Sequence, residues 1–171
     1  VAMLTLRSGI QFHDGTPLNA EAIKYMFDWI RKPENAAWTI GSLTDLESVE
    51  VAGPMKVRFN LKQPWAAFEG VLSGAVGYVL SQVALQQDPR RFESTAPKGL
   101  GPYTVEEASP GNHLKLKRNP NWWLAKALGR PEMPYFDGIQ ISVIPDPSVR
   151  LANFRAGAID ILGLDKTQYP T

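Results

Sequence analysis

Two neighbouring residues near the start of the chain carry side chains that could do chemistry. His13 and Asp14, in the run Phe-His-Asp-Gly, could act as an acid–base pair or supply two metal ligands. The only other histidine is His113, and the chain contains no cysteine. Because these groups are too few for a catalytic triad or a metal cage, we expect no catalytic residue, no metal and no cofactor. We interpret His13-Asp14-Gly15 as a turn, capped by side chains, that leads into a helix.

A glycine-rich turn at Gly99, Gly101 and Pro102 is a second candidate, because such turns can cradle phosphates. A phosphate loop continues with Lys-Ser or Lys-Thr and opens a helix, whereas the pattern here continues into a strand. We therefore expect the glycines to serve backbone conformations that a Cβ atom would forbid.

The adjacent Trp122 and Trp123 could stack on a ligand or pack over the hairpin that precedes them. If they lie on a strand, their side chains point to opposite faces, and at most one faces any given cleft. The pattern favours packing. Trp65, which follows Pro64, is similarly expected to anchor the start of a helix.

Composition sets limits on the class of protein. A chain of 171 residues suffices for one domain or two small lobes, and 44% apolar with 20% charged residues is typical of a folded globular protein. The net charge is +1, and the densest basic cluster, Lys115, Lys117 and Arg118, alternates along a predicted strand. We interpret that cluster as a solvated strand face and expect no nucleic-acid partner. The absence of cysteine is compatible with an exported protein.

In the first half of the chain, residues 1–7 are predicted to form a strand, so we expect the chain to begin inside a fold. Asn19 is a predicted N-cap, and apolar residues at helical spacing follow it as far as Lys32-Pro33. The remaining predicted elements are a hairpin over 48–61 turning at Gly53-Pro54, a helix over 65–73, a strand over 77–81, and a helix over 81–92 that opens on Ser81.

The second half begins after a composition break at residues 94–99. Tyr103 and Val105 are expected to pair with Leu114 and Leu116 across a turn at residues 110–112. A strand over 139–143, a helix capped by Asp146 and ending at Gly157, and a strand over 158–162 complete the prediction. The Pro and Gly residues of 97–101 mark the best lobe boundary, which divides the chain into segments 1–96 and 97–171.

Four motifs together carry a family resemblance: FHDGTPLNAEAIKYMFDWI, the GLGPY turn, RNPNWW, and YFDGI followed by VIPDPSVRLANFRAGAIDI. In this order they resemble the family 5 extracellular solute-binding proteins, the peptide and nickel receptors of bacterial ABC importers. The resemblance implies an α/β (mixed α+β) chain with the periplasmic binding protein-like fold of type II, peptide-receptor cluster. It further implies that residues 1–96 form the second-lobe segment and that 97–171 form part of the first lobe, without the third lobe.

The resemblance also implies a function. The chain would be the substrate-binding component of an ABC importer that captures peptides or similar small solutes for a permease of the inner membrane. Its place would be periplasmic or extracytoplasmic, with a lipid anchor in the full-length protein, and it would not be an enzyme. Without the closing lobe we expect weak ligand binding and self-association through unpaired edges. The expected cleft residues are Tyr25, Gly99, Leu100, Gly101 and Tyr103.

Two other functions remain open at this point. Family-like lobes can be joined to DNA-binding or signalling domains, which would make the chain a ligand-sensing module of a regulator. A hydrolase using His13 and Asp14 is the second alternative, and it predicts an activity that is lost in a His13→Ala variant. Residues before Val1 would separate transport from regulation, because a signal peptide or lipobox supports the former and a helix-turn-helix the latter.

Overall fold

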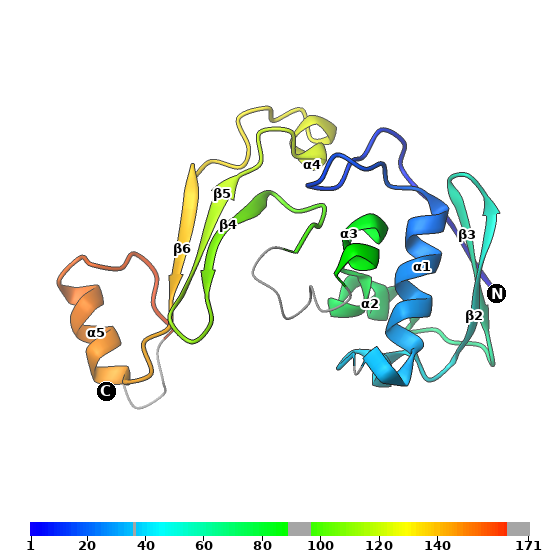
Figure 1. The fold of residues 1–171 in the computed structure, drawn as a ribbon, viewed down its shortest axis with the longest axis horizontal. Helices are drawn as coiled ribbons and strands as arrows, with labels where there is room; N and C mark the ends of the chain where they lie inside the picture. Colours follow the sequence, from blue (N-terminus) through cyan, green and yellow to red (C-terminus); the bar gives the residue numbers. More distant parts are fainter. Residues whose placement is uncertain (36, 89–96, 164–171) are drawn as a thin grey trace.

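The fold was analysed in a computed structural model, which describes residues 1–35, 37–88 and 97–163. The described chain forms two three-stranded antiparallel sheets connected by helices and loops. Figure 1 shows an arch, with one sheet and α1 (Ala20–Arg31) at one end and the second sheet with α5 (Pro147–Arg155) at the other. The expected class, α/β (mixed α+β), is therefore confirmed.

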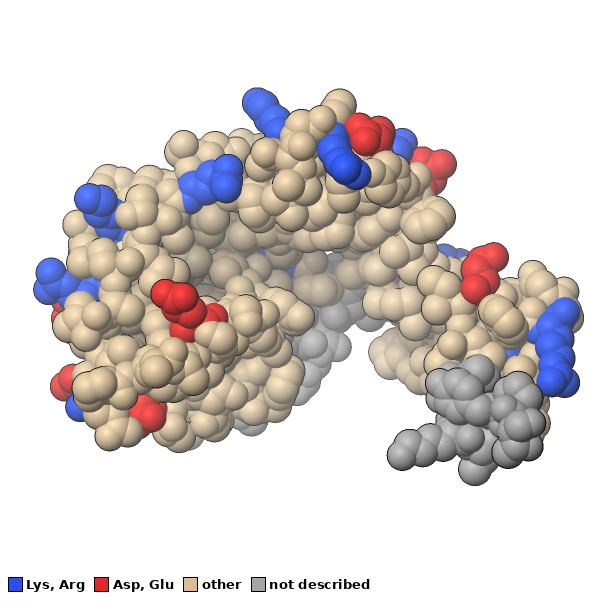
Figure 2. Space-filling view, turned by 180° about the vertical axis from the view of Figure 1, so that it is seen from behind, with Lys and Arg blue, Asp and Glu red and all other residues tan. Residues whose placement is uncertain are grey.

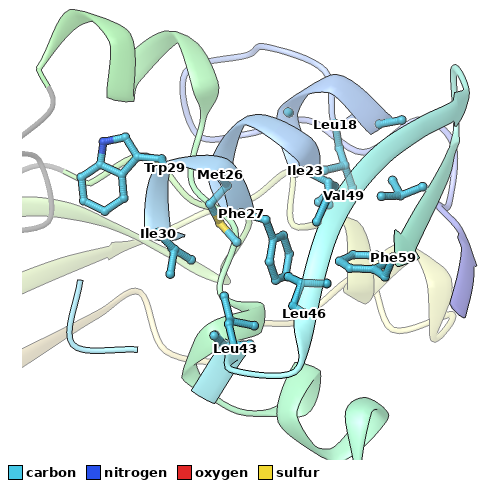
Figure 3. Close-up of a cluster of buried hydrophobic side chains, with 14 of the residues drawn as sticks. Leu18, Ile23, Met26, Phe27, Trp29, Ile30, Leu43, Leu46, Val49 and Phe59 are labelled. Carbon is cyan, nitrogen blue, oxygen red and sulfur yellow. The ribbon is translucent and has the colours of Figure 1, made fainter. Parts of the chain in front are cut away.

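The first sheet has the strand order β1-β3-β2, from β1 (Ala2–Thr5), β2 (Leu46–Gly53) and β3 (Lys56–Leu61). The last two strands form the predicted hairpin. Helix α1 lies across this sheet and buries its predicted apolar stripe against it (Figure 3). At the centre, the rings of Phe27 and Phe59 meet edge to face, with their centroids 5.1 Å apart. This core is the rigid base from which the turn around His13 projects.

The three N-caps expected from the sequence are all present. Asn19, Ser81 and Asp146 each accept a hydrogen bond from an N–H group in the first turn of the helix that follows. These helices are α1, α3 (Gln82–Gln87) and α5. Capping depends on residues within one turn, so a local pattern is enough to find it.

The second sheet has the order β4-β5-β6, from β4 (Tyr103–Ser109), β5 (His113–Arg118) and β6 (Gly138–Ser142). The predicted hairpin turn is present, with Gly111 in the left-handed region at φ +76°. The expected pairing of Tyr103 with the leucines is wrong, since Tyr103 lies opposite the last residue of β5. Val105 does lie opposite one of these leucines, Leu116, but a bulge after Val105 shifts the register and places Leu114 opposite Ala108.

Two predicted strands are absent from the structure. Residues 78–81 form a loop after a 3-10 turn that includes Gly77, and 158–162 form no strand, with Ile161 89% exposed. Both segments have strand-like residues, but a strand also needs a neighbour to bond its backbone, and no described strand pairs with either. The helix predicted over 81–92 is shorter than expected, because α3 ends at Gln87 and the backbone of Asp88 is extended. The lobe boundary at residue 96 lies outside the described residues.

Short helical elements connect the sheets. The predicted helix after Trp65 is α2 (Phe68–Ser73), and the Trp65 ring packs on Phe68 at 5.4 Å, as expected of an anchor. The others are 3-10 turns at Pro33–Asn35, Ile40–Leu43 and Ala75–Gly77, and the helix α4 (Trp123–Ala127). Among the described residues, no helix combines the length and the apolar character that a membrane crossing requires.

Candidate functional site

His13 joins two turns that are far apart in the sequence. Its Nδ1 accepts a hydrogen bond from the Gly99 N–H at 3.3 Å, and its Nε2 lies 2.9 Å from the Gly101 carbonyl oxygen. The backbone N–H of His13 also donates to the Gly99 carbonyl at 2.9 Å. One residue therefore fixes the position of the whole glycine-rich turn relative to the first half of the chain.

These contacts define the protonation of the ring. Since Nδ1 accepts from Gly99, the ring proton is on Nε2, from which it is donated to Gly101. Both nitrogens are thus engaged by the backbone, and neither is free to act as a general base. In the part of the chain that the structure describes, no group of three potential metal ligands occurs either. The geometry therefore favours the structural interpretation of His13 over the hydrolase.

Asp14 caps the same turn, as expected from the sequence. Its Oδ1 accepts from the Thr16 N–H at 3.0 Å and from the Thr16 hydroxyl at 2.6 Å. Partial burial disfavours the charged carboxylate, but hydrogen bonds from Ser81 and Thr16 outweigh it, and the pKa of Asp14 is lowered. Ser81 is fully buried, its hydroxyl lies 3.2 Å from that of Thr16, and it also caps α3. Asp14 therefore links the turn to that helix.

The glycine-rich turn precedes β4 on the inner side of the arch (Figure 1). Asn119 holds it from the other side, with its N–H on the Pro102 carbonyl at 2.8 Å and its side-chain amide on the Gly101 carbonyl at 3.3 Å. The expectation that these glycines serve special φ values is wrong. Neither Gly99 nor Gly101 has a positive φ, and a Cβ atom at Gly99 would meet its neighbours at ordinary contact distances.

Some backbone N–H and C=O groups of this turn form hydrogen bonds, and others do not. The carbonyls of Gly99 and Gly101 accept hydrogen bonds from His13, and the Gly99 N–H donates one. By contrast, both backbone groups of Leu100 and the N–H of Gly101 make no hydrogen bond to another described residue. The Leu100 side chain meanwhile packs against the main core. The turn is therefore anchored at its ends and offers free donors and an acceptor in its middle.

The remaining expected cleft residues are Tyr103 and Tyr25, of which Tyr103 follows this turn directly in the chain. Tyr103 begins β4, and its hydroxyl donates to the Phe136 carbonyl at 3.3 Å. Tyr25 lies on α1, half-buried, in the same hydrophobic cluster as Leu100. Four of the five residues are thus neighbours in the sequence, whereas Tyr25 lies on α1. The role of all five in ligand binding stays a prediction.

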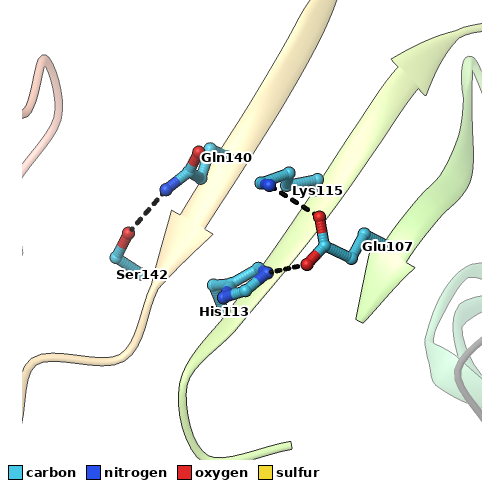
Figure 4. A network of polar contacts seen from close by, with 5 residues as sticks. All are labelled: Glu107, His113, Lys115, Gln140 and Ser142. Atoms are coloured by element: carbon cyan, nitrogen blue, oxygen red, sulfur yellow. Dashed lines mark hydrogen bonds and ion pairs between the residues drawn. The ribbon is translucent and has the colours of Figure 1, made fainter. Parts of the chain in front are cut away.

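The basic cluster on β5 is largely neutralised. Lys115 and His113 both hydrogen-bond to Glu107, at 2.6 and 2.8 Å (Figure 4). These bonds, led by that of Lys115, lower the pKa of Glu107. Arg118 forms an ion pair with Asp137 at 3.0 Å. Figure 2 likewise shows acidic and basic side chains interspersed on the visible face of the molecule.

The tryptophan pair lies differently from the prediction. Trp122 caps α4 and Trp123 is its first residue, so the pair does not follow the alternation of a strand. Trp123 packs against the main core, and both residues line one cavity. The expectation that at most one can face a given cleft is wrong, because a helix start turns adjacent side chains by about 100° rather than 180°.

Comparison with known families gives one match that covers nearly the whole chain. The model for "Bacterial extracellular solute-binding proteins, family 5 Middle" matches residues 2–171. Among curated proteins, the glutathione-binding protein GsiB of Salmonella typhi is 29% identical over 154 residues, which are 90% of this chain and 29% of that protein. The chain therefore spans about three tenths of the length of such relatives.

Solved structures agree with this match. NikZ from Campylobacter jejuni in complex with Ni(L-His) has a TM-score of 0.76 and 26% identity, covering 92% of this chain and 30% of that one. AgaA from A.tumefacien R10, in complex with agropinic acid, has a TM-score of 0.81 at 20% identity, with the same coverage, and bears on the fold alone. The two-sheet arch is thus a shared part of larger solute-binding proteins, and the predicted fold is confirmed.

Proposed function

The chain belongs to family 5 of the bacterial extracellular solute-binding proteins, and we propose that it forms one wall of the ligand cleft of an ABC importer's substrate-binding component. The match over residues 2–171 is the observation that carries this proposal. In the proposed role, residues 1–96 are the second-lobe segment and 97–171 are part of the first lobe. The assembled protein captures its solute outside the inner membrane, with a lipid anchor holding it there, and delivers it to permease subunits.

The turn of residues 99–101 is the proposed contact with the solute. Its support is the free backbone at Leu100 and Gly101, because solutes with amide and carboxylate groups are bound well by backbone N–H and C=O groups held in place beforehand. His13 and Asn119 supply that preorganisation. Tyr25 and Tyr103 are the proposed aromatic contacts beside it.

The proposed solute is a small peptide or another amino-acid derivative. The name of GsiB specifies glutathione, and the NikZ structure holds a nickel–histidine complex. Both solutes combine amine and carboxylate groups on a small body. Such a solute presents both donors and acceptors to the free backbone of the turn.

This chain by itself is proposed to bind weakly, since it spans only 29% of the length of GsiB. Tight binding requires burying most of the solute surface, and a single wall leaves its polar groups in water. The same exposure favours self-association, because Ile139 and Ile141 of the edge strand β6, and Val143 just after it, are exposed.

Calorimetric titration of the gene product containing this chain with glutathione and with di- to pentapeptides tests the proposal. Tyr25→Ala and Tyr103→Ala are each expected to weaken binding about tenfold or more, as truncation of an aromatic contact does. Tyr135→Ala, at a tyrosine that is 57% exposed in the loop before β6, is the matched control and should leave affinity unchanged. Absence of binding to every solute would contradict the proposed function, and equal affinity in all variants would remove the tyrosines from the site.

A further inference from the structure

A cavity of about 780 Å³ lies between the segment that follows β1 and the helix α4. Figure 1 shows these two parts meeting at the top of the arch. The cavity is lined by residues 7–11 on one side and by residues between 120 and 131 on the other. None of the five expected cleft residues lines it, so it is separate from the site proposed above.

The charge of the lining is one-sided. Arg7 and Lys126 line the cavity, and its lining includes no acidic residue. Both side chains are exposed, and neither forms an ion pair within residues 1–35, 37–88 and 97–163. By contrast, Lys115 and Arg118 of the second sheet are paired with Glu107 and Asp137. The cavity therefore keeps two uncompensated positive charges that attract an anion.

Aromatic surface lies beside these charges. Trp122 and Trp123 both line the cavity, and the guanidinium carbon of Arg7 is 5.7 Å from the centre of the Trp123 ring. Stacking on the ring restrains the guanidinium, which reduces the entropy lost when it binds a ligand. Its N–H groups match the geometry of a carboxylate, and Trp122 offers a second ring to a flat ligand body.

We propose that this cavity is a second binding site, which takes a small aromatic carboxylate. The carboxylate binds Arg7 and Lys126, and the aromatic body packs against the tryptophan pair. The volume lies within the range of about 300–1,000 Å³ typical of small-molecule sites. The proposal does not depend on the importer function, because it rests on the chemistry of the cavity alone.

Benzoate is the probe, and the indole N–H resonances of the five tryptophans are the readout in ¹H–¹⁵N NMR spectra of the 171-residue chain. Each resonance is assigned with a Trp→Phe variant. Benzoate should shift the signals of Trp122 and Trp123 with a dissociation constant of about 1 mM or tighter, while Trp38, which is 83% exposed and remote from this lining, should not respond. No shift at up to about 10 mM benzoate would overturn the proposal.

Two substitutions and two further probes test the recognition chemistry. Arg7→Gln and, independently, Lys126→Gln should each weaken benzoate binding about tenfold, as expected from the loss of a charge-assisted hydrogen bond. Arg155→Gln, at a basic residue in the last turn of α5, is the control and should change nothing. Benzylammonium or sulfate binding as well as benzoate, or an equal effect of all three substitutions, would refute an aromatic carboxylate site.

Discussion

The ring of His13 makes both of its hydrogen bonds to the backbone of residues 99–101, and this is the structural role of the histidine in the His-Asp-Gly turn. No sequence pattern could have identified these partners, because they lie 86 and 88 residues away. The local part of the same motif was predictable. Asp14 needs only Thr16, two residues on, to form its turn.

Replacing His13 with alanine should destabilise the protein. The change removes the acceptor of the Gly99 N–H and the donor to the Gly101 carbonyl. We expect it to lower the free energy of unfolding by about 1–3 kcal/mol. Urea-induced unfolding measures this cost. His113→Ala is the matched control, since His113 contacts only the exposed Glu107 among described acids, and it should cost less than about 1 kcal/mol. Equal costs for the two substitutions would contradict the anchoring role.

Asp14 should make the free energy of unfolding depend on pH in the acidic range. Its pKa is lower in the folded state than the unfolded value of about 3.9, so the ionised form stabilises the fold at higher pH. That contribution is present above pH about 4 and is lost as the pH falls through the lower native pKa. The free energy of unfolding of Asp14→Asn, measured between neutral pH and about pH 2.5, should therefore fall less steeply than that of the parent. Parallel pH profiles would rule out this contribution.

At the scale of the elements, the sequence correctly predicted the features that depend on residues close to one another in the chain. Helix α1 and the three N-caps follow from apolar spacing and from side chains within one turn. The strands expected at 77–81 and 158–162 were wrong because pairing depends on distant segments. The tryptophan pair was misplaced for a related reason, since Trp122 and Trp123 begin a short helix that lies against the segment after β1.

Gly138 allows β6 to lie close to β5. A Cβ atom there would lie 2.8 Å from the Leu116 carbonyl oxygen, so Gly138→Ala should force the strands apart and destabilise the fold by about 1–3 kcal/mol. Thermal unfolding and amide exchange of β5 and β6 measure the effect. Gly41→Ala meets nothing within 4 Å and needs no positive φ, so it should be close to neutral. Unchanged exchange rates in Gly138→Ala would mean that the sheet accommodates the methyl group.

At the scale of the whole molecule, the described chain is an arch with an open hollow beneath it (Figure 2). Its two sheets are connected through the bonds of His13 and Asn119 to the turn of residues 99–102. The fold is the shared part of proteins about three times as long, of which this chain covers 29 to 30%. The proposed function therefore assigns to this chain the role of one wall of a cleft.

Calorimetric titration with di- to pentapeptides of this 171-residue chain alone, beside the gene product in which it occurs, tests that assignment most directly. We expect micromolar or tighter binding by the gene product and no measurable binding by the chain alone, because enclosure between lobes supplies most of the affinity. Micromolar binding by the isolated chain would contradict it.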